Sequence, residues 1–169
     1  GWAGVGWPKA FGGQGRSAIE QFIFFDESMR AGAPVPMLSL NTVGPTLMNF
    51  GSDQQKEFFL PKILKGDLHF CIGYSEPGAG TDLAALQTRA VRDGDFYVLN
   101  GRKSWVTSGP VADYFVVFMM TDPDKKQKGV SAFLVEGNTK GLVRGKKEPK
   151  LGIRASATSE LIFEDCRIP

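Results

Sequence analysis

Residues 71–82 read CIGYSEPGAGTD, a polar loop with two glycines that leads into a hydroxyl and a carboxylate. Gly78 and Gly80 can adopt backbone angles that a side chain would forbid. Such a loop can turn successive backbone N–H groups toward one point and so form a concave anion site. Thr81 would add a hydroxyl donor at its rim. The pattern therefore predicts a loop that binds a phosphate or pyrophosphate.

The residues around this loop exclude two familiar nucleotide folds. Leu83 stands where the G-x-G-x-x-G fingerprint has its third glycine, and the following residues have the pattern of strands rather than of a helix. The loop also lacks the Gly-Lys-Ser/Thr of a P-loop. We therefore expect neither a Rossmann fold nor a P-loop ATPase.

Residues 16–66 have the signals of helices. The spacing of apolar residues predicts a helix over 17–30 that stops at Gly32. Ser52 and Gln55 form a capping box that begins a second helix. Within it, Pro61 predicts a kink or a break, because proline removes one N–H and clashes with the preceding turn. Gly66 would close the segment as a left-handed cap.

After Leu68 the signals change to turns and to a two-residue period. Asp93-Gly94 and Asn100-Gly101 predict hairpin turns that bracket a strand over 96–99, with residues 103–106 returning on the other side. A charged solvent loop is expected at 122–129. Further strands are predicted at 114–119, 130–135 and 160–163.

These signals together predict an α+β fold, with a helical N-terminal segment followed by an antiparallel β-barrel or sandwich. The domain boundary is expected after residue 67, which gives a partial helical domain over 1–67 and a β-domain over 68–169.

Composition excludes several classes of protein. The hydrophobic fraction of 42% allows a packed core, and a net charge of +2 gives no argument for nucleic acid. Cys71 and Cys166 lie far apart, which predicts neither a disulfide framework nor a zinc site and favours a reducing compartment. His69 is the single histidine of the sequence, so we expect no metal site there. We find no apolar run that predicts a membrane span and no signal peptide, so we expect a soluble protein.

A second motif narrows the class of protein to which the sequence can be compared. Residues 99–109 read LNGRKSWVTSG, and together with YSEPGAGTD at 74–82 they resemble the middle domain of acyl-CoA dehydrogenases. The segment 151–169, LGIRASATSELIFEDCRIP, is similar to the end of that domain. GWPKAFGGQG at 6–15 and FGSDQQKE at 50–57 resemble the family's N-terminal helical domain. Five ordered motifs thus extend the resemblance over nearly the whole chain.

The resemblance implies an activity and partners. Members of this family use FAD to oxidise an acyl-CoA thioester to 2-enoyl-CoA, within the β-oxidation of fatty acids or other lipids. Electrons would pass to an electron-transfer flavoprotein. The resemblance also implies a homo- or hetero-oligomer, a dimer or a tetramer, in the bacterial cytoplasm or the mitochondrial matrix.

By resemblance, main-chain and hydroxyl groups at Tyr74 and Ser75 contact the pyrimidine side of the flavin. Donors there would favour the negative charge of the reduced ring. Thr107 is similar in position to the family threonine that hydrogen-bonds flavin N5. Trp105 would lie against the isoalloxazine ring.

Gly80 and Thr81 would lie at the pyrophosphate, and the hydroxyl of Thr81 would also approach the CoA moiety as a substrate-binding group. The full set of cofactor-binding residues implied by the resemblance is Tyr74, Ser75, Gly80, Thr81, Trp105, Val106 and Thr107.

Simpler interpretations of the same residues stay open. A tryptophan on a strand is commonly a core residue, and Thr107 could simply end a strand. Glu76 is the only acid inside the loop before Asp82 and so invites the role of catalytic base. Pro77 behind it favours a role in a turn instead.

We expect no catalytic base in this chain, because the family places its glutamate in a C-terminal helical domain. Both ends of the sequence look cut relative to the family pattern, and the helices that determine acyl-tail specificity are only partly represented, by residues 33–50. Two alternatives remain: an acyl-CoA oxidase or flavin monooxygenase on the same scaffold, and a non-catalytic subunit or fragment.

Overall fold

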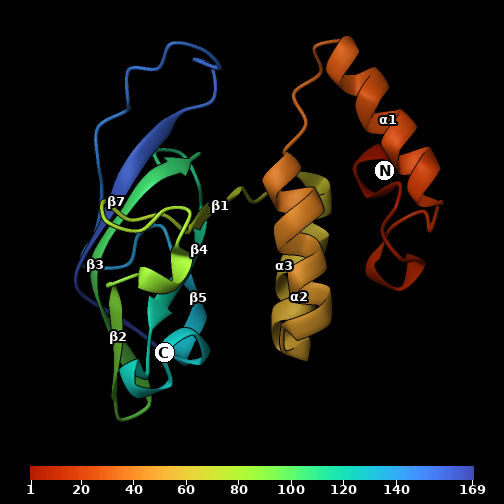
Figure 1. Cartoon of the computed structure of the whole chain (residues 1–169). Coiled ribbons are helices and arrows are strands. Elements are labelled where there is room, and N and C mark those ends of the chain that lie inside the picture. Colours follow the sequence, from red (N-terminus) through yellow and green to blue (C-terminus); the bar gives the residue numbers. More distant parts are fainter. The chain divides into compact units, whose positions relative to one another are not determined.

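The computed structural model describes all 169 residues, which divide into two compact units, Gly1–His69 and Phe70–Pro169. The first unit is helical (Figure 1). Its helices are α1 (Ala18–Arg30), α2 (Gly44–Phe50) and α3 (Asp53–Lys65), with short 3₁₀ turns at Trp2–Gly4 and Lys9–Phe11 and a π-helical turn at Ser39–Val43.

The ends of these helices follow the sequence. Ser17 and Ser52 each begin a helix with a complete capping box, and Gly66 ends α3 with a φ of +80°. Of the kink or break expected at Pro61, the break is wrong, because α3 continues through the proline as one helix. Phe59, Leu60 and Ile63 bury their side chains along this helix, and that packing outweighs the local cost of the proline.

The second unit is one curled sheet (Figure 1). Its strand order is β1-β4-β2-β3-β7-β6, with β5 paired to β4. The strands are β1 (Phe70–Gly73), β2 (Arg89–Asp93), β3 (Phe96–Thr107), β4 (Tyr114–Met120), β5 (Val130–Glu136), β6 (Leu142–Arg144) and β7 (Thr158–Ile168).

The predicted α+β class is confirmed, with one difference in the sheet. Most strand pairs are antiparallel, but β4 runs parallel to β1 and, at the Arg89–Met120 pair, to β2. The sheet is therefore mixed. The sequence did not predict β1, and a strand so short gives too little pattern to be found or paired from sequence alone.

One of the two predicted hairpins is confirmed. Asp93 pairs with Phe96 across a tight turn, and Gly94 has a φ of +62°. The hairpin predicted at Asn100-Gly101 is wrong, because both residues lie inside the long strand β3. Gly101 instead meets a close neighbour: a Cβ there would lie 2.5 Å from Cγ2 of Thr88.

The core of this unit lies inside the curl of the sheet and holds side chains from six of its seven strands and from the segment after β3. Phe115 and Leu161 are fully buried in it. Cys71 and Cys166 are free and buried, and burial raises the pKa of Cys71 to about 12, so its thiol stays protonated at neutral pH. In neither unit is any helix long and apolar enough to cross a membrane.

Candidate functional site

The exposed indole of Trp105 is the most unusual feature of the sheet. Trp105 has a φ of +58°, a left-handed conformation that is rare for a bulky residue, and its side chain is 66% exposed. It lies where β3 carries one residue more than β7: Lys103 pairs with Leu161, and Val106 pairs with Ser159. Bulges of this kind re-aim side chains and are common beside active sites.

The bulge decides which side chains of β3 point inward. Lys103 and Val106 are both buried, although a regular strand would place residues three apart on opposite faces. Trp105 and Thr107 are left exposed on either side of Val106. The predicted flavin contacts at Trp105 and Thr107 are therefore accessible, whereas Val106 can offer only its main chain.

The loop after β1 lies directly beside this bulge. The amide of Ser104 donates to the carbonyl oxygen of Ser75 at 2.8 Å, so the two motifs found in the sequence are hydrogen-bonded to each other. The Tyr74 ring stacks on Phe118 of β4, with centroids 4.6 Å apart, and remains 40% exposed. The structure thus brings Tyr74 and Ser75 together with the bulge at Trp105.

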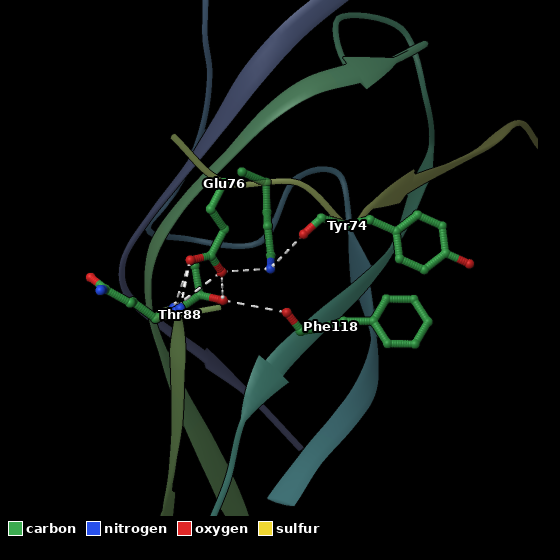
Figure 2. Close-up of polar contacts among 6 residues, drawn as sticks. Tyr74, Glu76, Thr88 and Phe118 are labelled. Atoms are coloured by element: carbon green, nitrogen blue, oxygen red, sulfur yellow. Dashed lines mark hydrogen bonds and ion pairs between the residues drawn. The ribbon is translucent and has the colours of Figure 1, made fainter. Parts of the chain in front are cut away.

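The buried Glu76 side chain joins the loop to the residues just before β2 (Figure 2). Its carboxylate accepts hydrogen bonds from the Gln87 amide at 2.6 Å, the Thr88 amide at 3.1 Å and the Thr88 hydroxyl at 2.5 Å. Lys103 Nζ donates to the same carboxylate at 2.8 Å. Because every partner is a donor, this carboxylate is held as an anion by the protein and is poorly placed to take a proton from a substrate.

The pKa values of both charged groups in this cluster lie below their ordinary values. Burial would raise the pKa of Glu76, but hydrogen bonds from Gln87, Lys103 and Thr88 outweigh it and hold that pKa below its ordinary value. Burial lowers the pKa of Lys103, and the Glu76 carboxylate offsets only part of this effect. The two groups form an ion pair with side chains 0% and 6% exposed.

The two glycines of the loop do not adopt the special backbone conformation that the sequence led us to expect. Neither Gly78 nor Gly80 has a positive φ, and a Cβ built on either meets nothing within 4 Å. The chain itself therefore does not require glycine at these positions. Gly80 and Thr81 are exposed, so both are accessible to a ligand, and only a ligand that approaches the backbone closely would explain the glycine.

Sequence reasoning missed Lys103, Gln87 and Thr88 as parts of this site. Lys103 lies within the second motif, but a lysine on a strand is usually read as solvated, and only the bulge turns it inward. Gln87 acts through its backbone amide, which no side-chain pattern can reveal.

Comparison with known proteins decides the family. The chain matches the family description "Acyl-CoA dehydrogenase, N-terminal domain" over residues 1–67 and "Acyl-CoA dehydrogenase, middle domain" over residues 71–166. This chain belongs to the acyl-CoA dehydrogenase family. The resemblance inferred from its five motifs is thereby confirmed.

Relatives within the acyl-CoA dehydrogenase family cover the whole chain. It is 51% identical to acyl-CoA dehydrogenase FadE26 of Mycobacterium tuberculosis, over 100% of this chain and 42% of that protein. The ChsE4–ChsE5 complex of the same organism is 52% identical with a TM-score of 0.92, over 100% of this chain and 43% of that one. The steroid ACAD Tcur3481–Tcur3483 is 46% identical with a TM-score of 0.94, over 100% and 44%. This chain therefore spans less than half the length of each relative.

Proposed function

We propose that this chain supplies the flavin- and substrate-facing part of an FAD-dependent acyl-CoA dehydrogenase, which converts an acyl-CoA thioester to 2-enoyl-CoA. The observation that carries the proposal is the exposed Trp105 at the bulge of β3, hydrogen-bonded through Ser104 to the loop at Ser75. Residues other than glycine that are held in the left-handed region cluster at functional sites, and the Trp105 ring is largely exposed. This is the arrangement expected where a flat ligand is to be held.

The exposed groups fit the chemistry of FAD. Trp105 offers a flat aromatic surface and Thr107 a hydroxyl near it. On the adjacent loop, Tyr74 and Ser75 would offer main-chain N–H and side-chain hydroxyl groups, since their carbonyl oxygens already accept from Lys103 and Ser104. Gly80 and Thr81 would hold the pyrophosphate, and Thr81 would also meet the CoA moiety. Val106 would contribute its main chain only. When bound, FAD would accept a hydride from the substrate β-carbon.

Removal of the α-proton requires a base, and we propose that the base is not among these 169 residues. Glu76, the acid inside the loop, is already engaged by Lys103 and by donors from Gln87 and Thr88. A glutamate from another helical segment, as in the family pattern, would then complete the site. We further propose an electron-transfer flavoprotein as the electron acceptor.

The assembly and the substrate class are also open to proposal. Two of the similar structures are named as pairs, ChsE4–ChsE5 and Tcur3481–Tcur3483, and the second is described as a steroid ACAD. We therefore propose a homo- or hetero-oligomer, and we propose short acyl-CoA and steroid side-chain CoA thioesters as the two substrate classes to compare first.

The test is the visible absorption spectrum of the complete protein, recorded without oxygen before and after adding each thioester. Flavin bands that bleach on addition are the expected result, and a protein purified without flavin that also fails to take up added FAD would refute the proposal. Rapid reoxidation by air of the substrate-reduced enzyme would instead indicate an acyl-CoA oxidase or a monooxygenase on this scaffold.

Gly80→Val provides a control on the loop. A side chain at Gly80 meets no protein atom within 4 Å, so the variant should fold like the wild type. Loss of flavin from a normally folded Gly80→Val protein is expected, because the side chain would block close approach of the pyrophosphate. Full flavin content in this variant would remove Gly80 from the site.

A further inference from the structure

Lys103 is a buried charge that the proposed chemistry does not use. Its side chain is 0% exposed, and its stem lies against β1, where a Cβ on Gly73 would come within 3.2 Å of Lys103 Cγ. A buried ion pair is a poor source of stability, because the loss of hydration offsets much of the attraction. Stability alone therefore does not explain why a lysine is buried at this position of the second motif.

That reason lies in the second hydrogen bond of the ammonium group. Lys103 Nζ donates to the main-chain carbonyl oxygen of Tyr74 at 3.2 Å, in addition to its bond with Glu76 (Figure 2). The peptide bond between Tyr74 and Ser75 is trans, as are all peptide bonds of the chain. In a trans peptide the C=O and the N–H point in opposite directions. Holding the Tyr74 carbonyl toward Lys103 therefore turns the Ser75 N–H away from the buried cluster.

The next carbonyl is held in the same way. The carbonyl oxygen of Ser75 accepts from the Ser104 amide at 2.8 Å, and the Glu76 amide donates to the carbonyl oxygen of Ala79 at 2.7 Å. Both bonds lie on the Ser75–Glu76 peptide, and the bond from Lys103 holds the Tyr74–Ser75 peptide, so the two peptide planes on either side of Ser75 are fixed. The loop is consequently set to offer a donor, rather than an acceptor, on the side away from Lys103.

We propose that Lys103 is a positioning residue for the flavin, which orients the Tyr74–Ser75 peptide so that the Ser75 N–H faces the electron-rich pyrimidine edge of the ring. Glu76 neutralises the charge of Lys103 and ties the loop to Gln87 and Thr88, while the bond from Lys103 to the Tyr74 carbonyl is separate from it. The inference rests on the proposed function, since it requires a flavin beside this loop.

Two single variants of similar side-chain shape and their combination separate this role from a purely structural one. Lys103→Met removes the donor to the Tyr74 carbonyl and also breaks the ion pair. Glu76→Gln breaks the ion pair but leaves Lys103 able to donate to Tyr74. The double variant Lys103→Met/Glu76→Gln removes both charges, so that no unpaired ion stays buried, and should recover most of the thermal stability lost in Lys103→Met.

The experiment measures the dissociation constant of FAD, the visible spectrum of the bound flavin and the melting temperature for the complete protein and the three variants. We expect Lys103→Met and the double variant to bind FAD at least about tenfold more weakly, the factor that one well-placed hydrogen bond to a charged group is worth. Glu76→Gln should bind FAD within about threefold of the wild type, because the Tyr74 carbonyl keeps its donor. The spectrum of the flavin should shift in the two variants that lack Lys103 and not in Glu76→Gln.

Each other outcome has a definite meaning. Equal loss of affinity in Lys103→Met and Glu76→Gln would overturn the inference and leave the ion pair as a structural element. Recovery of wild-type FAD affinity in the double variant, in step with its stability, would overturn it as well. A wild-type protein that does not bind FAD at all would overturn the proposed function together with this inference.

Discussion

Two bulges interrupt the pairing of β3 with β7, and they are built differently. At the first, β7 carries the extra residue, and Asp165 adopts a φ of +46°. At the second, β3 carries the extra residue, and Trp105 adopts a φ of +58°. Both place a residue other than glycine in the left-handed region. Only at the first is that residue hydrogen-bonded to a side chain of the neighbouring strand.

The bulge at Asp165 satisfies its own polar groups. The Asn100 side chain donates to the Asp165 carboxylate at 3.0 Å and accepts from the Asp165 amide at 2.9 Å. Aspartate also tolerates the left-handed conformation better than most residues. The bulge at Trp105 instead exposes a large aromatic ring that gains little from the protein. The first bulge is thus held by side chains of the sheet itself, whereas the second leaves a large ring exposed, and we propose that the second forms part of the flavin site.

The largest expected effect is on the structural bulge. Gly101→Ala forces a side chain into a φ of +130° and against Cγ2 of Thr88 at 2.5 Å, so we expect a loss of about 3 kcal/mol in the free energy of unfolding. The matched control is Gly94→Ala, which has a positive φ but open space around it and should lose only about 1 kcal/mol. Chemical denaturation compares the two, and equal losses would show that the contact with Thr88 is not restrictive.

A substitution at Trp105 should change FAD affinity rather than stability. Trp105→Ala removes an exposed ring, and we expect the melting temperature to stay unchanged while FAD affinity falls by up to about tenfold, the worth of one aromatic stack. Isothermal titration with FAD measures the affinity. Unchanged affinity would place the flavin away from this ring.

Asn100→Ala should instead lower stability and leave FAD affinity unchanged. It removes both hydrogen bonds to Asp165, and we expect a loss of about 1 kcal/mol in stability, since the pair is exposed to water. FAD affinity should not change, because this bulge faces no ligand in our account. A variant that loses flavin without losing stability would contradict the distinction between the two bulges.

The smallest effect concerns pH and the carboxylate beside the second bulge. The pKa of Glu76 lies below its ordinary value of 4.5 in the folded protein, so its contribution to stability is complete above that pH. The contribution is lost as the pH falls through the folded-state pKa, because the unfolded chain then binds the proton more readily. Glu76→Gln should therefore be less stable than the wild type at neutral pH, and the difference in melting temperature should narrow in acid. A difference that stays constant with pH would show that the charge of Glu76 is not stabilising.

Local signals predicted much of the fold. The capping boxes at Ser17 and Ser52, the left-handed cap at Gly66 and the turn at Asp93-Gly94 depend on neighbours in the chain and were found from sequence. The Gly101 prediction was wrong because a glycine is needed there to make room for Thr88, which lies thirteen positions earlier in the chain, immediately before β2. The parallel pairing of β1 with β4 is likewise a long-range feature without a local pattern.

The candidate site shows the same division. The two motifs at 74–82 and 99–109 predict residues for a flavin site, and the structure joins these motifs by the hydrogen bond from the Ser104 amide to the Ser75 carbonyl oxygen. The support beneath them could not be predicted, because the burial of Lys103 depends on the bulge and its partner is the backbone of Tyr74. Patterns of residue type reveal exposed chemistry better than they reveal the buried contacts that hold it.

The most direct test of the central claim is the position of the flavin in a crystal structure of the complete protein with bound FAD. We expect the isoalloxazine ring to lie against the Trp105 indole, with the Ser75 N–H donating to an oxygen or nitrogen of the pyrimidine edge. A flavin bound elsewhere, with Trp105 covered by protein and the Tyr74–Ser75 peptide turned the other way, would contradict it.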